Sequence, residues 1–320
     1  MVVERSEEVP SLETIRAAAR RIAPHVHRTP VLGCASLDRM VGATLLFKCE
    51  NLQKVGAFKA RGAHNAVFSL AEEEAARGVA THSSGNHAQA LALAAHNRGV
   101  AAHVVMPSNS AAVKVEAVKG YGAKVTFCEP TLEARETTLE AVVEETGATF
   151  VHPYDNYAII AGQATAALEL LEEEPVLDVV MAPVGGGGLL SGTALATHYL
   201  STETRVIAAE PAGADDAFRS FEAGRIIPQK NPQTVADGLR TSLGERNFPI
   251  IKQHVERIVT VSEQGIVDAM RAVWERMKLI VEPSAAVPLA ALLEGAVDLA
   301  GKRVGIIFSG GNVDLAKLPW

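Results

Sequence analysis

Gly185-Gly186-Gly187-Gly188-Leu189-Leu190-Ser191-Gly192 is the string that says most about the architecture and the ligand of this chain. It follows an apolar run at 179–184 and precedes a segment of helical pattern. Four consecutive glycines let the backbone turn tightly, and free N–H groups at a helix start form a site for an anion such as a phosphate. The stretch is neither a Walker loop nor the dinucleotide fingerprint. A glycine-rich turn with only a structural role is the alternative interpretation.

The same order, a short apolar run and then a helical segment, recurs along the chain. Predicted strands lie at 45–47, 79–82, 101–106, 124–127, 176–182, 205–209, 258–261 and 303–308, and predicted helices at 11–22, 87–97, 111–119, 132–145 and 264–278. This alternation indicates parallel sheets covered by helices on both faces. The units fall into two groups, so we expect two open-sheet α/β domains with the active site in the cleft between them. We predict a discontinuous large domain of residues 1–55 and 153–320, and a small domain of residues 56–152.

The composition narrows the possible partners. The chain has 320 residues, of which 48% are hydrophobic. Its net charge is -7 and it has no long basic run, which argues against nucleic acid as a binding partner. Residues 1–10 carry glutamates and lack an apolar stretch, so we predict no signal peptide, and no window is apolar enough for a membrane span. The three cysteines lie far apart and fit a reducing compartment. We therefore expect a cytoplasmic protein that binds neither nucleic acid nor membrane.

Three further strings carry polar or glycine residues where strands are expected to end, which is where ligands bind in open α/β sheets. Ser83-Ser84-Gly85-Asn86-His87-Ala88-Gln89 suits a carboxylate and a ring oxygen, or is simply a capped helix. Gly56-Ala57-Phe58-Lys59-Ala60-Arg61-Gly62-Ala63 places Lys59 among small and apolar residues, which would lower its pKa, unless it is an ordinary surface charge. Ser309-Gly310-Gly311-Asn312 closes the last predicted strand.

Together and in this order, the four strings resemble the fold-type II (tryptophan synthase β-like) pyridoxal-phosphate (PLP) enzymes, most closely the serine and threonine dehydratases and serine racemases. The resemblance runs from Thr29-Pro30-Val31 to Asn312-Val313-Asp314. It implies that Lys59 binds the cofactor covalently and that Phe58 packs beside the ring. It also implies that Asn86 binds the 3′ oxygen and Ser309 the pyridine nitrogen. Gly185, Gly186, Gly187, Gly188 and the N–H of Leu189 would hold the phosphate.

The resemblance also implies how the substrate reacts. Lys59 would remove the α-proton and the β-hydroxyl would leave, giving a keto acid and ammonia from serine, threonine or threo-3-hydroxyaspartate. A serine hydroxyl cannot hold a pyridinium proton, so the ring nitrogen would stay neutral, which favours elimination. Ser84 would face the α-carbon opposite Lys59, which permits racemisation as well. The substrate carboxylate would be received by Ser83, Ser84, Gly85, Asn86 and His87.

Arg135 matches a position that can reach a second substrate carboxylate in this branch, with His152 nearby, and would favour 3-hydroxyaspartate. The alternative is an exposed helix charge beside Glu136. Tyr154 departs from the asparagine of animal serine racemases, a difference that weakens the case for racemase specificity.

Glu210-Pro211-Ala212-Gly213-Ala214-Asp215-Asp216 resembles the divalent-metal site of the serine racemase branch. Glu210 and Asp216 would give carboxylates and Ala214 its carbonyl, hard oxygen ligands that suit Mg²⁺, and also Ca²⁺ or Mn²⁺. The alternative is an acidic helix start, because carboxylates there complement the helix dipole.

The resemblance further implies a homodimer and a nucleotide effector between subunits. The matching nucleotide positions are Lys54, Gln89, Tyr121, Lys278 and Asn312, whereas Ala35 replaces a serine. We expect no regulatory domain after the Ser309 string. Two other functions stay open at this point, a PLP synthase that performs β-replacement and a non-catalytic ligand-binding protein on the same fold.

Overall fold

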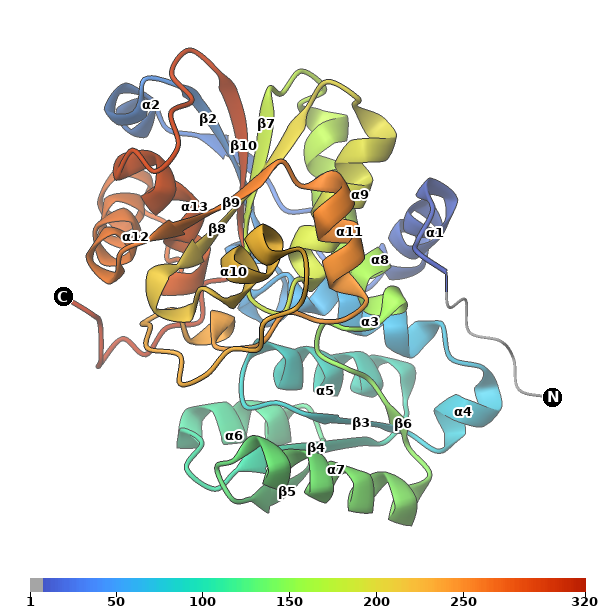
Figure 1. Ribbon diagram of the computed structural model, residues 1–320. Coiled ribbons are helices and arrows are strands. Elements are labelled where there is room, and N and C mark those ends of the chain that lie inside the picture. The colour runs from blue at the N-terminus through green and yellow to red at the C-terminus, as the bar shows by residue number, and fades with distance from the viewer. Residues whose placement is uncertain (1–7) are drawn as a thin grey trace.

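The computed structural model describes residues 8–320. Most of residues 1–10, for which we predict no signal peptide, therefore lies outside the described residues. Two separate sheets form the framework (Figure 1). The six-stranded sheet contains, in spatial order, β1 (Val31–Gly33), β2 (Thr44–Cys49), β10 (Arg303–Phe308), β7 (Val179–Pro183), β8 (Arg205–Pro211) and β9 (Arg257–Val261). Its strands are parallel except for β1, which pairs antiparallel with β2.

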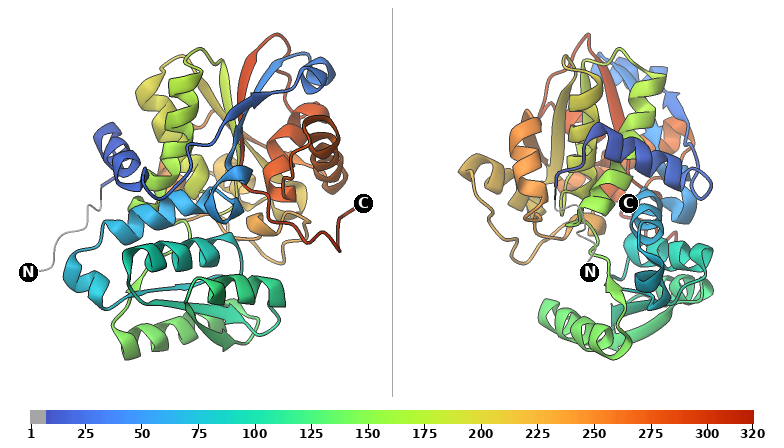
Figure 2. Two further views of the ribbon diagram at one scale, coloured as in Figure 1. Left: turned by 180° about the vertical axis from the view of Figure 1, so that it is seen from behind. Right: turned by 90° about the vertical axis from the view of Figure 1, so that its right-hand side faces the viewer.

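The second sheet is all parallel and lies within the chain segment predicted as the small domain. Its spatial order is β5 (Lys124–Cys128), β4 (Ala102–Pro107), β3 (Val79–His82) and β6 (Thr149–Phe150). Figure 2 shows this part of the chain as a lobe beside the large sheet in both views. The domain limits at residues 55–56 and 152–153 remain a prediction.

Helices cover both faces of each sheet, as parallel sheets require. Their bounds are α1 (Leu12–Ile22), α2 (Ala35–Val41), α3 (Lys59–Phe68), α4 (Glu72–Ala76), α5 (Asn86–Arg98), α6 (Ala112–Gly120), α7 (Leu132–Thr146), α8 (Tyr157–Glu173), α9 (Gly188–Leu200), α10 (Asp216–Ala223), α11 (Asn247–His254), α12 (Glu263–Met277) and α13 (Pro283–Leu293). Short 3₁₀ turns are η1 (Glu50–Leu52), η2 (Lys54–Gly56), η3 (Ala212–Ala214) and η4 (Asp237–Leu239).

The core of the large part has two layers. One layer packs α2, α12 and α13 on the sheet, and the other packs α1, α8, α9 and α11 on the opposite face. In the small part, α5 and α6 lie on one face of the sheet and α7 on the other. α8 contacts both α3 and α9, so it joins the helix that begins at Lys59 to the helix that begins at Gly188.

The structure confirms the predicted strands and helices with small shifts of their bounds. The strand predicted at 176–182 is β7 (Val179–Pro183), because Val176 is an exposed residue before the sheet. Ser262 caps α12 by accepting a hydrogen bond from the backbone N–H of Gly265. Among residues 8–320, no helix combines the length and apolarity that a membrane crossing needs.

Candidate active site

The structure brings together the segments that carry the predicted cofactor residues. The N–H of Phe58 donates to the carbonyl of Ser309 at 3.0 Å, and the adjacent pair Ala57 and Gly310 forms an isolated antiparallel bridge. The amide of Asn312 donates to the Asn86 side-chain oxygen at 2.9 Å. The Lys59, Asn86 and Ser309 strings therefore meet at the carboxyl ends of β3 and β10, although they are up to 250 residues apart in sequence.

Lys59 is the first residue of α3 and its side chain is partly buried. Its Nζ donates to the carbonyl of Pro153 at 2.9 Å and lies 5.1 Å from the centre of the Phe58 ring. Burial lowers the pKa of Lys59 to about 8, and the nearby carboxylate of Glu282 opposes that shift. A substantial share of neutral amine near pH 8 is what a nucleophile or base requires.

The four glycines turn between β7 and α9, all buried, with Gly187 at φ 94°. A Cβ on Gly186 would lie 2.4 Å from the Tyr154 ring, and one on Gly187 would lie 2.8 Å from Cβ of Asn247. Only glycine fits these positions, and the turn presents the orphan N–H groups of a helix start. Gly188 and Leu189 lie in the first turn of α9.

Ser309 and Thr241 are among the residues of the described chain whose buried hydroxyls have no hydrogen-bond partner. Ser309 is 3% exposed and its Oγ is unpartnered. The Oγ1 of Thr241 is also unpartnered, and it lies 3.2 Å from where a Cβ on Gly185 would stand. A buried polar atom without a partner costs free energy unless a ligand or water satisfies it. Thr241 was missed from the sequence, because an isolated threonine in a loop carries no signal.

Asn86 belongs to a partly buried polar cluster that the sequence analysis did not predict. Its amide donates to both carboxylate oxygens of Glu282 at 3.1 Å, and the N–H of Asn312 donates to Glu282 at 3.2 Å. Burial raises the pKa of Glu282 to about 7, and the hydrogen bond from Asn86 works against that rise. The cluster fixes the direction of the Asn86 side chain, which the resemblance assigns to the 3′ oxygen.

The turn predicted to receive the substrate carboxylate stands at the start of α5. Ser83, Ser84 and Gly85 are partly exposed there, and Ser83 Oγ accepts a 3.3 Å bond from the N–H of Gly85. His87 is buried, and burial lowers its pKa well below the usual value. Its Nε2 lies 3.3 Å from the carbonyl of Val151, so Nε2 carries the proton and the unpartnered Nδ1 is an acceptor. The ring of His87 therefore cannot donate to a carboxylate in this state, whereas its backbone N–H at the helix start can.

Arg135 lies in α7 and is partly buried, with an Nε atom that has no partner in the described residues. It is therefore not a fully exposed helix charge, and within residues 8–320 it forms no ion pair with Glu136. Burial is the main reason why the pKa of His82, the residue before Ser83, is lowered, and the charge of Arg135 lowers that pKa further. The His82 ring lies 6.4 Å from that of His152, which lies 4.6 Å from that of Tyr154.

The predicted metal residues lie at the end of β8 and the start of α10. Glu210 accepts bonds from the N–H groups of Ala217 at 3.1 Å and Phe218 at 2.8 Å. Asp216 accepts one from the N–H of Leu243 at 2.8 Å, and its Oδ1 is buried without a partner. Burial raises the pKa of Asp216 to about 7 and, together with the charge of Asp216, raises that of Glu210 well above its usual value.

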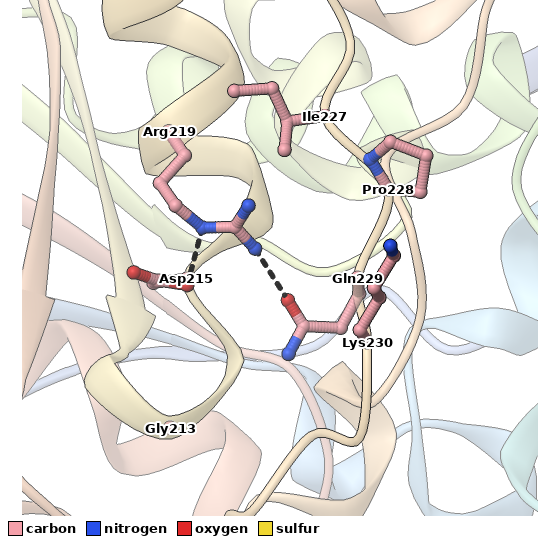
Figure 3. A pocket seen from close by; sticks show the side chains of 7 residues that line it. All are labelled: Gly213, Asp215, Arg219, Ile227, Pro228, Gln229 and Lys230. Carbon is pink, nitrogen blue, oxygen red and sulfur yellow. Dashed lines mark hydrogen bonds and ion pairs between the residues drawn. The ribbon is translucent and has the colours of Figure 1, made fainter.

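Glu210 and Asp216 alone provide fewer carboxylate or other side-chain ligands than a typical metal site. No cluster of three or more His, Cys, Asp or Glu side chains within residues 8–320 could hold a metal ion, and the predicted set has two such side chains and the carbonyl of the buried Ala214. An open pocket beside it, drawn in Figure 3, contains none of the predicted site residues. There Asp215 pairs with Arg219 at 2.8 Å, and Arg219 also donates to Gln229 at 3.0 Å.

One ligand type fits the assembled residues. The Lys59 amine suits an aldehyde, the glycine turn suits a phosphate, and the Ser309 hydroxyl suits a ring nitrogen acceptor. PLP carries all three groups. The fold and the site thus define a PLP-dependent enzyme of fold type II.

Comparison with known proteins gives the family. The family model described as "Pyridoxal-phosphate dependent enzyme" matches residues 22–310. The chain is 53% identical over 312 residues to a beta-hydroxyaspartate dehydratase of Paracoccus denitrificans, covering 98% of this chain and 99% of that protein. It is 46% identical to an L-threo-3-hydroxyaspartate ammonia-lyase of Saccharomyces cerevisiae, covering 97% and 95%. The crystal structure of serine racemase from Dictyostelium discoideum superposes with a TM-score of 0.92 at 50% identity, over 95% of this chain and 99% of that one.

The chain therefore belongs to the pyridoxal-phosphate-dependent enzyme family, in the branch of the serine racemases and hydroxyaspartate dehydratases. This confirms the family, the fold class and the cofactor that the sequence strings imply. The roles of the individual site residues remain predictions, which the geometry above now makes specific.

Proposed function

We propose that this enzyme dehydrates and deaminates a small β-hydroxy amino acid, with threo-3-hydroxyaspartate as the preferred substrate, to a keto acid and ammonia. The observation that carries the preference is Arg135, a partly buried guanidinium without an ion-pair partner in the described residues, near His82 and the Ser83–Ser84 turn. A cation there complements a second carboxylate, which serine and threonine lack. Two relatives whose names specify hydroxyaspartate support the choice.

The residues divide the work as follows. The N–H groups at the start of α5, with Ser83 and Ser84, hold the α-carboxylate, and Arg135 holds the β-carboxylate. Lys59, with its pKa lowered to about 8, takes the α-proton as a free amine. Bound PLP supplies the electron sink for the charge left on the α-carbon. The Ser309 hydroxyl keeps the ring nitrogen neutral, which favours loss of the β-hydroxyl over a long-lived carbanion.

The test compares both threo-3-hydroxyaspartate enantiomers with L-serine, D-serine and L-threonine, scored for keto acid and for the inverted amino acid. A hydrogen bond to a charged group contributes about 1.5–3 kcal/mol, so Arg135→Ala is expected to lower kcat/KM for hydroxyaspartate by roughly 10- to 150-fold. The same change should alter kcat/KM for L-serine less than threefold, and Glu136→Ala is the matched control. Equal loss on both substrates would remove Arg135 from substrate recognition.

Racemisation is a second candidate activity of the same site, because Ser84 stands partly exposed in the turn and relatives are named serine racemases. Ser84→Ala is expected to abolish inversion while sparing elimination from one enantiomer. Keto acid release without an added nucleophile separates both activities from β-replacement, and cofactor absorbance separates them from mere ligand binding.

We further propose a divalent cation, Mg²⁺ or its analogues Ca²⁺ and Mn²⁺, at Glu210, the Ala214 carbonyl and Asp216. Support comes from two buried carboxylates, of which Asp216 makes the ionisation of Glu210 more costly, and from the unpartnered Oδ1 of Asp216. A cation would offset this repulsion. The site lies far from Lys59 in the sequence, at the end of β8, and we assign the cation a bracing role.

We also propose that the protein is a cytoplasmic homodimer and that a nucleotide activates it. Three free cysteines in the described part fit a reducing compartment. Asn312 contacts both Asn86 and the carbonyl of Val55, so two of the predicted nucleotide segments adjoin the active site. Light scattering with and without ATP tests the assembly, and kcat measured with ATP and Mg²⁺ tests the activation.

A further inference from the structure

A largely buried ion-pair network surrounds Arg61, two residues after Lys59 in α3. The guanidinium is 0% exposed and donates to both oxygens of Glu50, at 2.8 Å each. It also donates to both oxygens of Glu169, at 2.8 and 2.7 Å, and to Thr165 at 3.1 Å. These bonds use all five N–H groups of the arginine. None of the roles assigned above accounts for this network.

The network balances its own charge. Lys48, also 0% exposed, pairs with Glu169 at 2.7 Å and donates to the carbonyl of Thr29 at 2.6 Å. Thr29 in turn donates to Glu50 at 2.5 Å. Two cations and two carboxylates, from Lys48, Arg61, Glu50 and Glu169, thus share one site, in which only Glu169 keeps some exposure, 13% of its side chain. Buried ion pairs cost desolvation and are weak sources of stability, but they demand a defined geometry of the groups that carry them.

The partners of Arg61 belong to different elements. Glu50 follows β2 of the large sheet, whereas Thr165 and Glu169 lie on α8. The next residue, Gly62, donates its N–H to Gln163 of α8 at 3.1 Å. A Cβ on Gly162 of α8 would lie 2.6 Å from Cα of Gly62, so the two helix backbones touch. The position of α3 on α8 is therefore fixed, because α3 cannot slide or rotate without breaking these contacts.

α8 meets the phosphate helix in the same way on another side. A Cβ on Gly192 of α9 would lie 2.6 Å from the backbone nitrogen of Ala164. α8 is thus in backbone contact with α3, which starts at Lys59, and with α9, which starts at the glycine turn. The cofactor must reach both helix starts at once, with its aldehyde at Lys59 and its phosphate at the glycines.

We propose that Arg61 is a positioning residue that holds α3 in place on α8 and thereby sets the distance between the Lys59 amine and the phosphate-binding turn. The inference rests on the PLP dependence that family membership shows, and it does not depend on which amino acid is the substrate. Arg61 touches neither cofactor nor substrate in this account. It acts through the placement of Lys59.

The test uses two ligands for the apoenzyme. PLP needs both anchors at the right separation, whereas pyridoxal, which lacks the phosphate, needs only the amine. Arg61→Met alone leaves an uncompensated buried carboxylate, so the decisive variant is Arg61→Met with Glu50→Gln, which keeps the network neutral. Arg61→Lys keeps the charge but loses the planar fork, and it serves if the double variant does not fold. Arg28→Met is the control, because Arg28 pairs with Glu172 and Glu173 of the same helix at the surface.

Dissociation constants are read from the visible absorbance that appears on binding, and unfolding temperatures of the apoenzymes are read alongside. We expect the double variant and Arg61→Lys to bind PLP at least tenfold more weakly, with pyridoxal binding changed less than threefold. Arg28→Met should bind both ligands as the parent does. If PLP and pyridoxal weaken by the same factor, or if PLP binding is unchanged, Arg61 does not set this separation and the proposal is wrong.

Discussion

Ser309→Ala is expected to act in opposite directions on the two forms of the enzyme. In the apoenzyme the Ser309 hydroxyl is buried and unpartnered, so its removal relieves part of a desolvation cost of about 1–3 kcal/mol. At roughly 2.1 cal/mol/K of unfolding entropy for each of the 320 residues, a relief of about 1–2 kcal/mol raises the apoenzyme Tm by roughly 1.5–3 °C. In the loaded enzyme, a bond to the ring nitrogen of about 0.5–1.5 kcal/mol is lost, which raises the PLP Kd about 2- to 12-fold.

Differential scanning fluorimetry of apoenzyme and titration with PLP measure the two effects separately. Ser201→Ala is the control, because the Ser201 hydroxyl is already satisfied by Thr204 at 2.7 Å, at the far end of α9. That variant should lower the apoenzyme Tm slightly and leave the PLP Kd unchanged. A fall in apoenzyme Tm for Ser309→Ala, with unchanged PLP affinity, would refute the assignment of this hydroxyl to the cofactor ring.

Three further predictions follow from named contacts. Burial lowers the pKa of Lys59 to about 8, so the rate of cofactor loading should rise about tenfold per pH unit below 8 and level off above it; a plateau reached only above pH 10 would contradict this. Chelation by EDTA should lower the holoenzyme Tm and Mg²⁺ at about 100 times its Kd should restore about 2.7 kcal/mol, whereas Asp216→Asn should respond to neither. Gly186→Ala puts a Cβ 2.4 Å from the Tyr154 ring and should weaken PLP binding, measured by absorbance, whereas Gly120→Ala, which has open space, should not.

The predictable part of the fold is the part with a clear period. Strands such as β3 and β10 are short β-branched runs, and α12 shows one buried stripe, so all three are evident in the sequence. α8 and α13 were not predicted, because they are buried on most sides and show no apolar stripe. β1 and β6 have only three and two residues, too few for any pattern.

The site divides in a similar way. Lys59 and the glycine turn stand in strings whose chemistry is local, so the sequence points to them directly. The sequence does not point to Glu282, because a glutamate before Pro283 is typical of an ordinary helix start. Its partner Asn86 is 196 residues away, and only the assembled fold shows that the carboxylate orients that amide. The same holds for Arg61, whose string was noticed for its lysine.

The position of β10 in the large sheet bears on how the protein is made. β10 pairs with β2 on one side and with β7 on the other, so it joins the two parts of its sheet, yet it is synthesised after the other five strands of that sheet. The four-stranded sheet, whose strands lie between residues 79 and 150, has no such dependence and can assemble early in synthesis. Until residues 303–308 arrive, β2 can pair only with β1 and β7 only with β8, so each of them exposes one unpaired edge that is prone to aggregation.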